Sequence, residues 1–375
     1  MSPATRGHHA DPHADRDGFS AHTVRLAWIL GLAYLLIVVY ASLQPFQGWR
    51  LPPPEIAGFL AAPWPRYITS QDIFVNVAAY VPLGFLLSIG FGARYDAGRG
   101  VLAATFCAAA LSLALETLQV FLPTRIASNV DLLTNSVGAL IGAMAAPLFA
   151  PTHVVGGRVH ALRHRWFYEG MAADVGLVII CLWPVTQFNP LTQLFGTGAI
   201  RATFDLPAYS TYTPGLALGG EAAVTFFNLL GIGLMMSVLL RRAELRMWLI
   251  GLLTGIALLL KAVSTAVLHK GGAVLSWLTP GVTIGLLGGW AVLYGVTRLP
   301  RGLRFALAAL SVVLATAAVN LAPDNPYHSI PMQLMTSGQS HFLNFSGIVR
   351  ALSELWPALA LSFLVYGLVE RAAQD

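Results

Sequence analysis

Carboxylate, amide and phenol side chains recur at helical spacing inside apolar stretches of the sequence. Asp72, Asn76 and Tyr80 are four residues apart, and Glu116 and Gln119 are three apart, so each set shares one face of a helix. Ionisable groups inside long apolar segments are costly and are commonly functional. Such groups can perform acid/base chemistry or bind a cationic or sugar-bearing headgroup.

A further polar set follows directly along the chain. Arg125 and Ser128 lie in a short connector, and Asp131 and Asn135 open the next apolar run four residues apart. The catalytic candidates are therefore Glu116, Asp131 and Asp72, and the candidate substrate-binding residues are Asn76, Tyr80, Gln119, Arg125, Ser128 and Asn135. A structural role stays open, because Asp72 and Asp131 could cap their helices and Glu116 could hydrogen-bond Asn76 and Asn135. We expect no metal and no cofactor, because the sequence contains no HExxH, Walker A or GxGxxG signature.

The elements that position these residues are long apolar helices. Of the 375 residues, 56% are hydrophobic and only 10% are charged, against about 25% in soluble proteins, which argues against a soluble enzyme. About 20 apolar residues cross a bilayer as a helix. We therefore predict an all-α, polytopic transmembrane helical bundle of about ten spans, near residues 24–44, 73–93, 101–122, 131–150, 172–188, 221–240, 247–268, 277–297, 304–322 and 351–370.

The basic residues predict the orientation of these spans. Of the 22 lysines and arginines, fifteen fall on the side of the N-terminus, six on the other side, and Lys261 within a span. Cytoplasmic loops carry the excess of basic residues, which predicts that both termini are cytoplasmic. The polar sets then lie toward the outer side of what we expect to be the inner, cytoplasmic membrane. Nucleic-acid binding is not expected, because the basic residues are distributed as short clusters between spans.

The sequence also suggests an internal duplication. At an offset of 145 residues, Glu116 corresponds to Lys261 and Gln119 to Ser264, while Gly84 to Ser88 resembles Gly233 to Ser237. The second copy has lost the acidic pattern, since Asp131 corresponds to Ser276 and Asn135 to Pro280. An ion pair between Glu116 and Lys261 is one hypothesis for the intramembrane lysine.

The repeat divides the chain into five parts. We expect a disordered cytoplasmic tail (1–23), a four-helix unit (24–150), a cytoplasmic linker (151–171), a degenerate second four-helix unit (172–298) and a C-terminal helix pair (299–375). Cys107 and Cys181 lie inside apolar runs, which predicts buried small side chains rather than a disulfide.

The polar pattern of residues 25–150 resembles the VanZ-like family of membrane proteins. The resemblance lies in Pro45-Phe46, in Asp72-xxx-Asn76 leading to Tyr80-Val81-Pro82-Leu83-Gly84, and in Glu116-xx-Gln119 with Pro123. Arg125, Ser128, Asp131-xxx-Asn135 and Gly138 complete it. The family takes its name from a protein implicated in resistance to the glycopeptide antibiotic teicoplanin. The resemblance implies a cell-envelope role and leaves the biochemical activity open.

Three functions are compatible with this pattern. In the first, an outer-facing polar site binds or modifies a lipid-linked or glycopeptide-like envelope molecule, with Glu116 as acid/base, Asp131 and Asp72 as its partners and Arg125 as an anion contact. The second is a transporter or flippase, and the third is a non-catalytic scaffold. The expected partners are membrane lipid and a lipid-linked envelope precursor, while the oligomeric state is not predicted.

Overall fold

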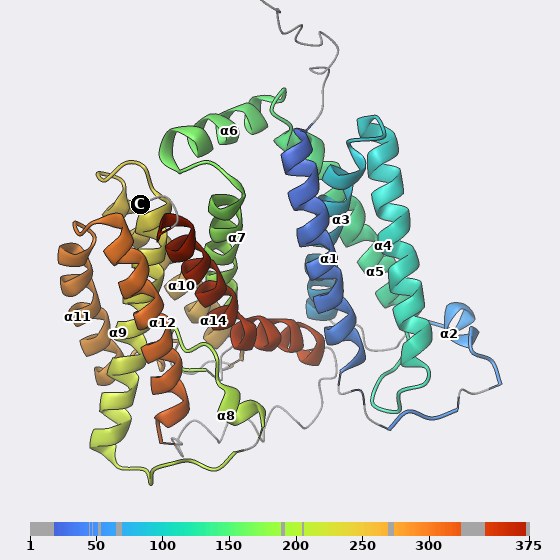
Figure 1. The fold of residues 1–375 in the computed structure, drawn as a ribbon. Coiled ribbons are helices and arrows are strands. Elements are labelled where there is room, and N and C mark those ends of the chain that lie inside the picture. The colour runs from blue at the N-terminus through green and yellow to red at the C-terminus, as the bar shows by residue number, and fades with distance from the viewer. Residues whose placement is uncertain are drawn as a thin grey trace, which may run out of the picture. The chain divides into compact units, whose positions relative to one another are not determined.

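The computed structural model describes residues 19–44, 46, 48–51, 54–64, 70–188, 192–204, 206–268, 274–323 and 342–372 (Figure 1). Within these ranges every regular element is a helix, and one isolated β-bridge joins Phe167 and Leu240. Most of the tail expected at residues 1–23, the Pro45 motif position and the side chain of Asp72 lie outside the described residues.

All ten apolar segments expected from the sequence correspond to helices. Eight are long and apolar enough to cross a membrane, and two, Met171–Thr186 and Pro280–Val296, are shorter apolar helices. The prediction of an all-α, polytopic helical bundle is therefore confirmed. The orientation inferred from the basic residues stays a prediction.

The first compact unit extends from the N-terminus to Leu162. Its helices are α1 (Ala21–Leu43), α2 (Gly58–Ala61), α3 (Ser70–Phe91), α4 (Ala97–Gln119) and α5 (Asn129–Ala145), followed by the 3-10 helix η1 (Ala146–Phe149). Helix α3 is central, because it packs against α1, α4 and α5. The apolar core between them includes Leu83, Leu115 and Ala139.

Helices α3 and α5 approach each other so closely that their backbones are in contact. A Cβ atom added to Gly138 would lie 2.2 Å from the carbonyl oxygen of Val77, and one added to Gly142 would lie 1.9 Å from that of Val81. From the other side, a Cβ on Gly84 would lie 2.0 Å from the carbonyl oxygen of Ala139. Small residues at membrane-helix interfaces permit this approach, so only glycine fits at these three positions.

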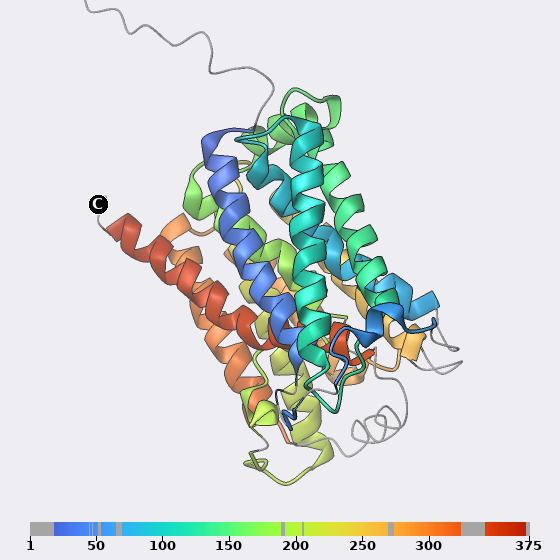
Figure 2. The same ribbon diagram turned by 90° about the vertical axis from the view of Figure 1, so that its right-hand side faces the viewer.

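The second compact unit extends from Arg163 to the C-terminus. Its helices are α7 (Met171–Thr186), α8 (Ile200–Thr203), α9 (Pro214–Leu239), α10 (Arg246–Leu268), α11 (Pro280–Val296), α12 (Arg301–Leu321) and α14 (Phe342–Ala372). Helix α9 is central, because 78% of its most apolar stretch is buried. It packs against α11, α12, α7 and α10. Helix α14 packs against α7 and α12, so the C-terminal helices belong to this unit (Figure 2). The core is aromatic around Trp183, Phe195 and Trp356.

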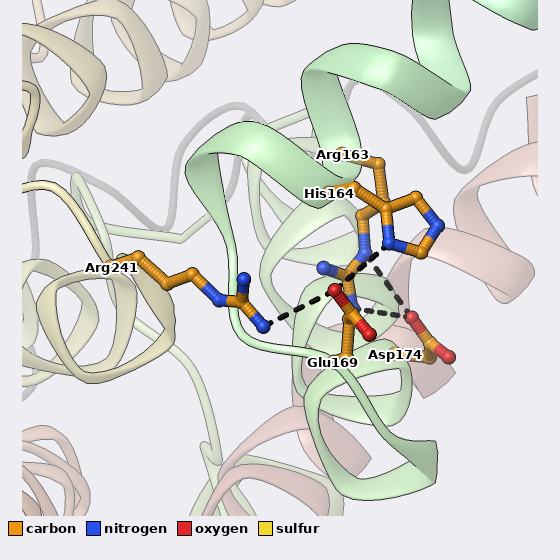
Figure 3. Close-up of polar contacts among 5 residues, drawn as sticks. All are labelled: Arg163, His164, Glu169, Asp174 and Arg241. Atoms are coloured by element: carbon orange, nitrogen blue, oxygen red, sulfur yellow. Dashed lines mark hydrogen bonds and ion pairs between the residues drawn. The ribbon is translucent and has the colours of Figure 1, made fainter.

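The segment expected as a linker contains a helix, α6 (Val154–Trp166), and polar contacts fix its end (Figure 3). The Nη2 atom of Arg163 is 2.6 Å from Asp174 Oδ1 in the first turn of α7. The Glu169 carboxylate lies 3.0 Å from His164 Nδ1 and 3.2 Å from Arg241 Nη2. The turn from α6 into α7 is therefore tied to the residues that follow α9.

In each unit, a phenylalanine and a glycine in the segment after the first apolar helix have positive φ values, at different distances from the end of that helix. Phe46 and Gly48 have φ values of 60° and 74°, and Phe195 and Gly198 have values of 63° and 75°. In the second unit, a Cβ added to Gly285 of α11 would lie 2.5 Å from the carbonyl oxygen of Ala222 in α9. The crossing of α9 and α11 therefore resembles that of α3 and α5, while the duplication itself stays a prediction.

One expectation about side chains is wrong. Cys107 on α4 and Cys181 on α7 are exposed on the outside of their units, not buried. Periodicity alone does not separate the core-facing from the lipid-facing side of a helix that is apolar all round, because lipid is as apolar as the core.

Candidate functional site

Glu116 is buried near the end of α4, with an exposed fraction of 3%. Small residues four apart on the same face, Ala104, Ala108 and Ser112, are fully buried and bring this face of α4 against its neighbours. The Oε2 atom of Glu116 accepts a hydrogen bond of 2.8 Å from the backbone N–H of Ser128. The carboxylate is therefore held by the connector that leads into α5.

Asp131 is the second buried carboxylate, in the first turn of α5, and is 8% exposed. It interacts electrostatically with Glu116 and with Tyr80. The N-cap of α5 is Ser128, whose Oγ accepts hydrogen bonds from the backbone N–H groups of Val130 at 3.2 Å and Asp131 at 3.4 Å. The expectation that Asp131 caps this helix is thus wrong, because the serine two residues before Val130 already fills that position.

Amide and hydroxyl groups from three helices meet at Ser112 of α4. The Nδ2 group of Asn135 on α5 donates to Ser112 Oγ at 2.9 Å, and Tyr80 on α3 forms a side-chain hydrogen bond with the same serine. Asn76, one turn before Tyr80, is 8% exposed, and its Nδ2 atom has no hydrogen-bond partner among the described residues. The amide of Asn135 therefore binds Ser112 rather than Glu116, and Asn76 retains an unused donor.

Gln119 and Arg125 contact the end of α1. Gln119 Nε2 donates to the carbonyl oxygen of Ser42 at 3.1 Å. Arg125 donates through Nε to Gln44 at 2.9 Å and through Nη2 to Ala41 at 3.1 Å, in both cases to the carbonyl oxygen. These carbonyls belong to the last turn of a helix and need donors from elsewhere. The two side chains thus fix α1 against the connector.

The charge of Arg125 is coupled to that of Glu116. Partial burial lowers the pKa of the Arg125 guanidinium, and the Glu116 carboxylate opposes that shift. A guanidinium stays protonated in proteins. Arg125 therefore supplies a positive charge at the rim of the site.

The structure brings together most of the predicted site residues. Glu116, Asp131, Asn76, Tyr80 and Asn135 are all buried in the first unit, while Gln119, Arg125 and Ser128 hold the surrounding backbone. The side chain of Asp72 lies outside the described residues. Within the part of the chain that is described, no group of three His, Cys, Asp or Glu residues is arranged to hold a metal ion.

Sequence reasoning missed two members of this polar core. Ser112 joins Asn135 to Tyr80, and Tyr34 of α1 donates its hydroxyl to the carbonyl oxygen of Ala79 at 2.9 Å. Ser112 precedes Glu116 by four residues, so its position on the same helical face was a usable signal. Tyr34 gave no such signal, because its partner is a backbone carbonyl on another helix.

The second unit carries hydrogen bonds at the corresponding positions. Lys261 of α10 is 1% exposed and donates through Nζ to the carbonyl oxygen of Thr192. Ser264 donates to the carbonyl oxygen of Phe188, just after α7, as Gln119 does to the end of α1. An ion pair between Lys261 and Glu116 stays a prediction.

These observations define a class of protein: a polytopic α-helical membrane protein with a buried polar site in its N-terminal four-helix unit. Residues 23–150 match the family model described as VanZ/LLP1. This segment is a VanZ-like domain, and its limits agree with the unit of four long helices. No curated protein and no solved structure gave a significant match to the chain.

Proposed function

We propose that the polar site of the VanZ-like domain binds a lipid-linked or glycopeptide-like molecule of the cell envelope, in the cytoplasmic membrane and from its outer side. The observation that carries the proposal is the pair of buried carboxylates, Glu116 and Asp131, in the same unit as the buried, unused amide donor of Asn76. Two neighbouring carboxylates in a low-dielectric environment repel each other when both are ionised. A cationic or hydroxyl-bearing headgroup between them would offset that cost.

The chemistry of the site suits a sugar or peptide headgroup. Carboxylates accept hydrogen bonds from hydroxyl and ammonium groups, and an amide both donates and accepts. In this proposal Glu116 contacts the headgroup and acts as acid or base, with Asp131 as its partner. Arg125 lies at the rim as an anion contact, although two carbonyls of α1 already occupy part of its guanidinium.

A role in glycopeptide susceptibility follows from the family resemblance, and replacement of the two carboxylates tests it. Glu116→Gln and Asp131→Asn, singly and together, should change the teicoplanin susceptibility of a host that expresses the protein. Glu55→Gln, at an exposed position of the same unit, is the matched control. The membrane level of each variant is measured by immunoblot, so that loss of protein is separated from loss of function.

Native mass spectrometry of the purified full chain tests binding directly. We expect an envelope lipid to co-purify with the wild type and with Glu55→Gln, and to be lost from the double variant. Unchanged susceptibility together with retained lipid in the double variant would exclude this site as the binding site.

Transport of such a molecule is the second candidate function. The observation that favours it is that each unit buries an ionisable side chain in a span, Glu116 in α4 and Lys261 in α10, within a repeated helix arrangement. Lipid movement in proteoliposomes distinguishes the two functions, because a binding protein gives none above protein-free vesicles.

A further inference from the structure

Four arginines gather at one end of the second unit. Arg246 begins α10, Arg301 and Arg304 lie in the first turn of α12, and Arg371 lies in the last turn of α14. Helices α12 and α14 pack against each other, and both views show the start of α12 near the end of α14 (Figures 1 and 2). Residues from three helices, far apart in the sequence, therefore share one location.

The guanidinium groups of this arginine cluster repel one another. Arg304 interacts electrostatically with Arg246, Arg301 and Arg371, and Arg301 interacts with Arg371 as well. The carboxylate that interacts with Arg301 is the exposed Glu370. None of the ion pairs found among the described residues includes any of the four arginines. The four guanidinium groups and the one carboxylate of Glu370 together carry a net positive charge.

Backbone carbonyls account for part of the donor capacity of the cluster. Arg304 Nη1 donates to the carbonyl oxygen and to the hydroxyl of Ser237, and Arg301 Nε donates to the carbonyl oxygen of Val238 at 2.8 Å, both at the end of α9. Arg246 Nη1 donates to the carbonyl oxygen of Thr297 at 2.8 Å. Arginines at helix C-termini stabilise them, and this role orients the side chains.

Other donors of the cluster have no acceptor. Arg246 Nε and Arg371 Nη1 are shielded from solvent and have no hydrogen-bond partner within the described chain. Buried donors without partners are uncommon and costly. The ring of Tyr168 lies under the Arg301 guanidinium, whose central carbon is 3.6 Å from the ring centroid, and this contact holds Arg301 in place. The cluster is thus preorganised, positively charged and incompletely satisfied.

We propose that Arg246, Arg301, Arg304 and Arg371 bind a phosphate group, and that an anionic phospholipid of the adjacent leaflet supplies it. Guanidinium groups bind phosphate oxygens through paired, charge-assisted hydrogen bonds. Basic pockets between membrane helices on the cytoplasmic side bind the headgroups of anionic lipids, and the distribution of basic residues predicts that this end of the unit is cytoplasmic. This site is separate from the polar site of the VanZ-like domain and does not depend on its function.

A lipid titration of the purified full chain tests the proposal. Native mass spectrometry in detergent measures binding of phosphatidylglycerol, with phosphatidylcholine as the neutral-headgroup comparison and inorganic phosphate as the soluble one. Arg371→Gln should weaken phosphatidylglycerol binding about fivefold, the ratio that corresponds to about 1 kcal/mol per arginine. Arg371→Lys keeps the charge without the paired donors, so it should lose less binding than Arg371→Gln does. The exposed Arg242, in the loop before α10, provides the matched control Arg242→Gln, which should stay within about twofold of the wild type.

Three results would overturn the proposal. Equal losses in Arg371→Gln and Arg242→Gln would show that only general surface charge acts. Phosphatidylcholine binding as strong as phosphatidylglycerol binding would exclude a site for an anionic headgroup. Saturable binding of inorganic phosphate that Arg371→Gln weakens, without phosphatidylglycerol binding, would refute the lipid source. Thermal unfolding of each variant without lipid tests whether the variant is folded. We expect the Arg371 variants to be folded, because no hydrogen bond joins the Arg371 side chain to another described residue.

Discussion

Replacing Gly142 by alanine should separate α3 from α5. The new Cβ would lie 1.9 Å from the carbonyl oxygen of Val81, 2.8 Å from its carbonyl carbon and 2.9 Å from the backbone nitrogen of Phe85. Because all three atoms are backbone, no side-chain rotation relieves the clash. The closest ordinary C···O contacts are about 3.3 Å, so the helices must move apart locally by about 1.4 Å.

The expected cost of Gly142→Ala follows from this displacement. Overpacking a tight interface costs about 1–3 kcal/mol, and a gap of 0.5–1 Å forfeits roughly a quarter to a half of each neighbouring dispersion contact. The lower backbone entropy of alanine in the unfolded chain returns only about 0.4–1 kcal/mol. We therefore expect the free energy of unfolding to fall by about 1–2 kcal/mol.

Unfolding in mixed detergent micelles, followed by tryptophan fluorescence, measures this loss. Gly255→Ala on α10 is the control, because a Cβ there meets no atom within 4 Å. That variant should be unchanged or stabilised by up to about 1 kcal/mol. A stability of Gly142→Ala within about 0.5 kcal/mol of the wild type would refute the reasoning that the backbones are in contact.

Three further substitutions address the polar contacts. Ser112→Ala removes the acceptor of the buried Asn135 amide and should lower the free energy of unfolding by about 1–3 kcal/mol, measured in the same micelles, whereas no change would show that Asn135 finds another acceptor. Ser128→Ala removes the N-cap of α5 and should cost about 1 kcal/mol in that assay, and Ser128→Asn, which keeps a neutral acceptor, should recover most of it. Glu169→Gln tests pH dependence: the hydrogen bond from His164, and then the charges of His164 and Arg241, hold the pKa of Glu169 below its ordinary value of 4.5. The contribution of the ionised Glu169 carboxylate to stability is then complete above about pH 4.5 and is lost as the pH falls through the lowered pKa. The unfolding temperature of Glu169→Gln should therefore differ from that of the wild type at about pH 6 and not in strong acid. A constant difference across that pH range would contradict this assignment.

The positions of the helices could be predicted from the sequence, because each long apolar run marks one helix and its length sets the approximate ends of that helix. The exact start of α5 could not, since Ser128 and Asp131 are both good N-cap residues and the connector conformation decides between them. The contacts of the expected C-terminal helix pair could not be predicted either: α12 packs against α14 and also against α9. That contact depends on which faces of uniformly apolar helices meet, and composition does not encode it.

The candidate site was predictable where one helix determines the arrangement. Asn76 and Tyr80 share a buried face because they are four residues apart, and Asp131 and Asn135 do so for the same reason. The partners of Gln119 and Arg125 were not predictable, because both bind backbone carbonyls of α1 that are distant in the sequence. Every residue has a backbone carbonyl group, so the residue types in a sequence do not show which carbonyl accepts the hydrogen bond.

The glycine crossing of α3 and α5 also determines how the site can open. With backbone against backbone, no side chain can change rotamer to widen the gap, so we expect the two helices, with Asn76 on α3 and Asp131 on α5, to move together. At the start of α4 the approach is less close: a Cβ added to Gly100 would meet its nearest atom, the carbonyl oxygen of Ser88, at 3.8 Å. In the proposed function, we therefore expect a headgroup to reach Glu116 by displacement of the connector around Ser128, whose backbone N–H holds the carboxylate. Amide hydrogen exchange should accordingly be slowest along α3 and α5 and faster in that connector.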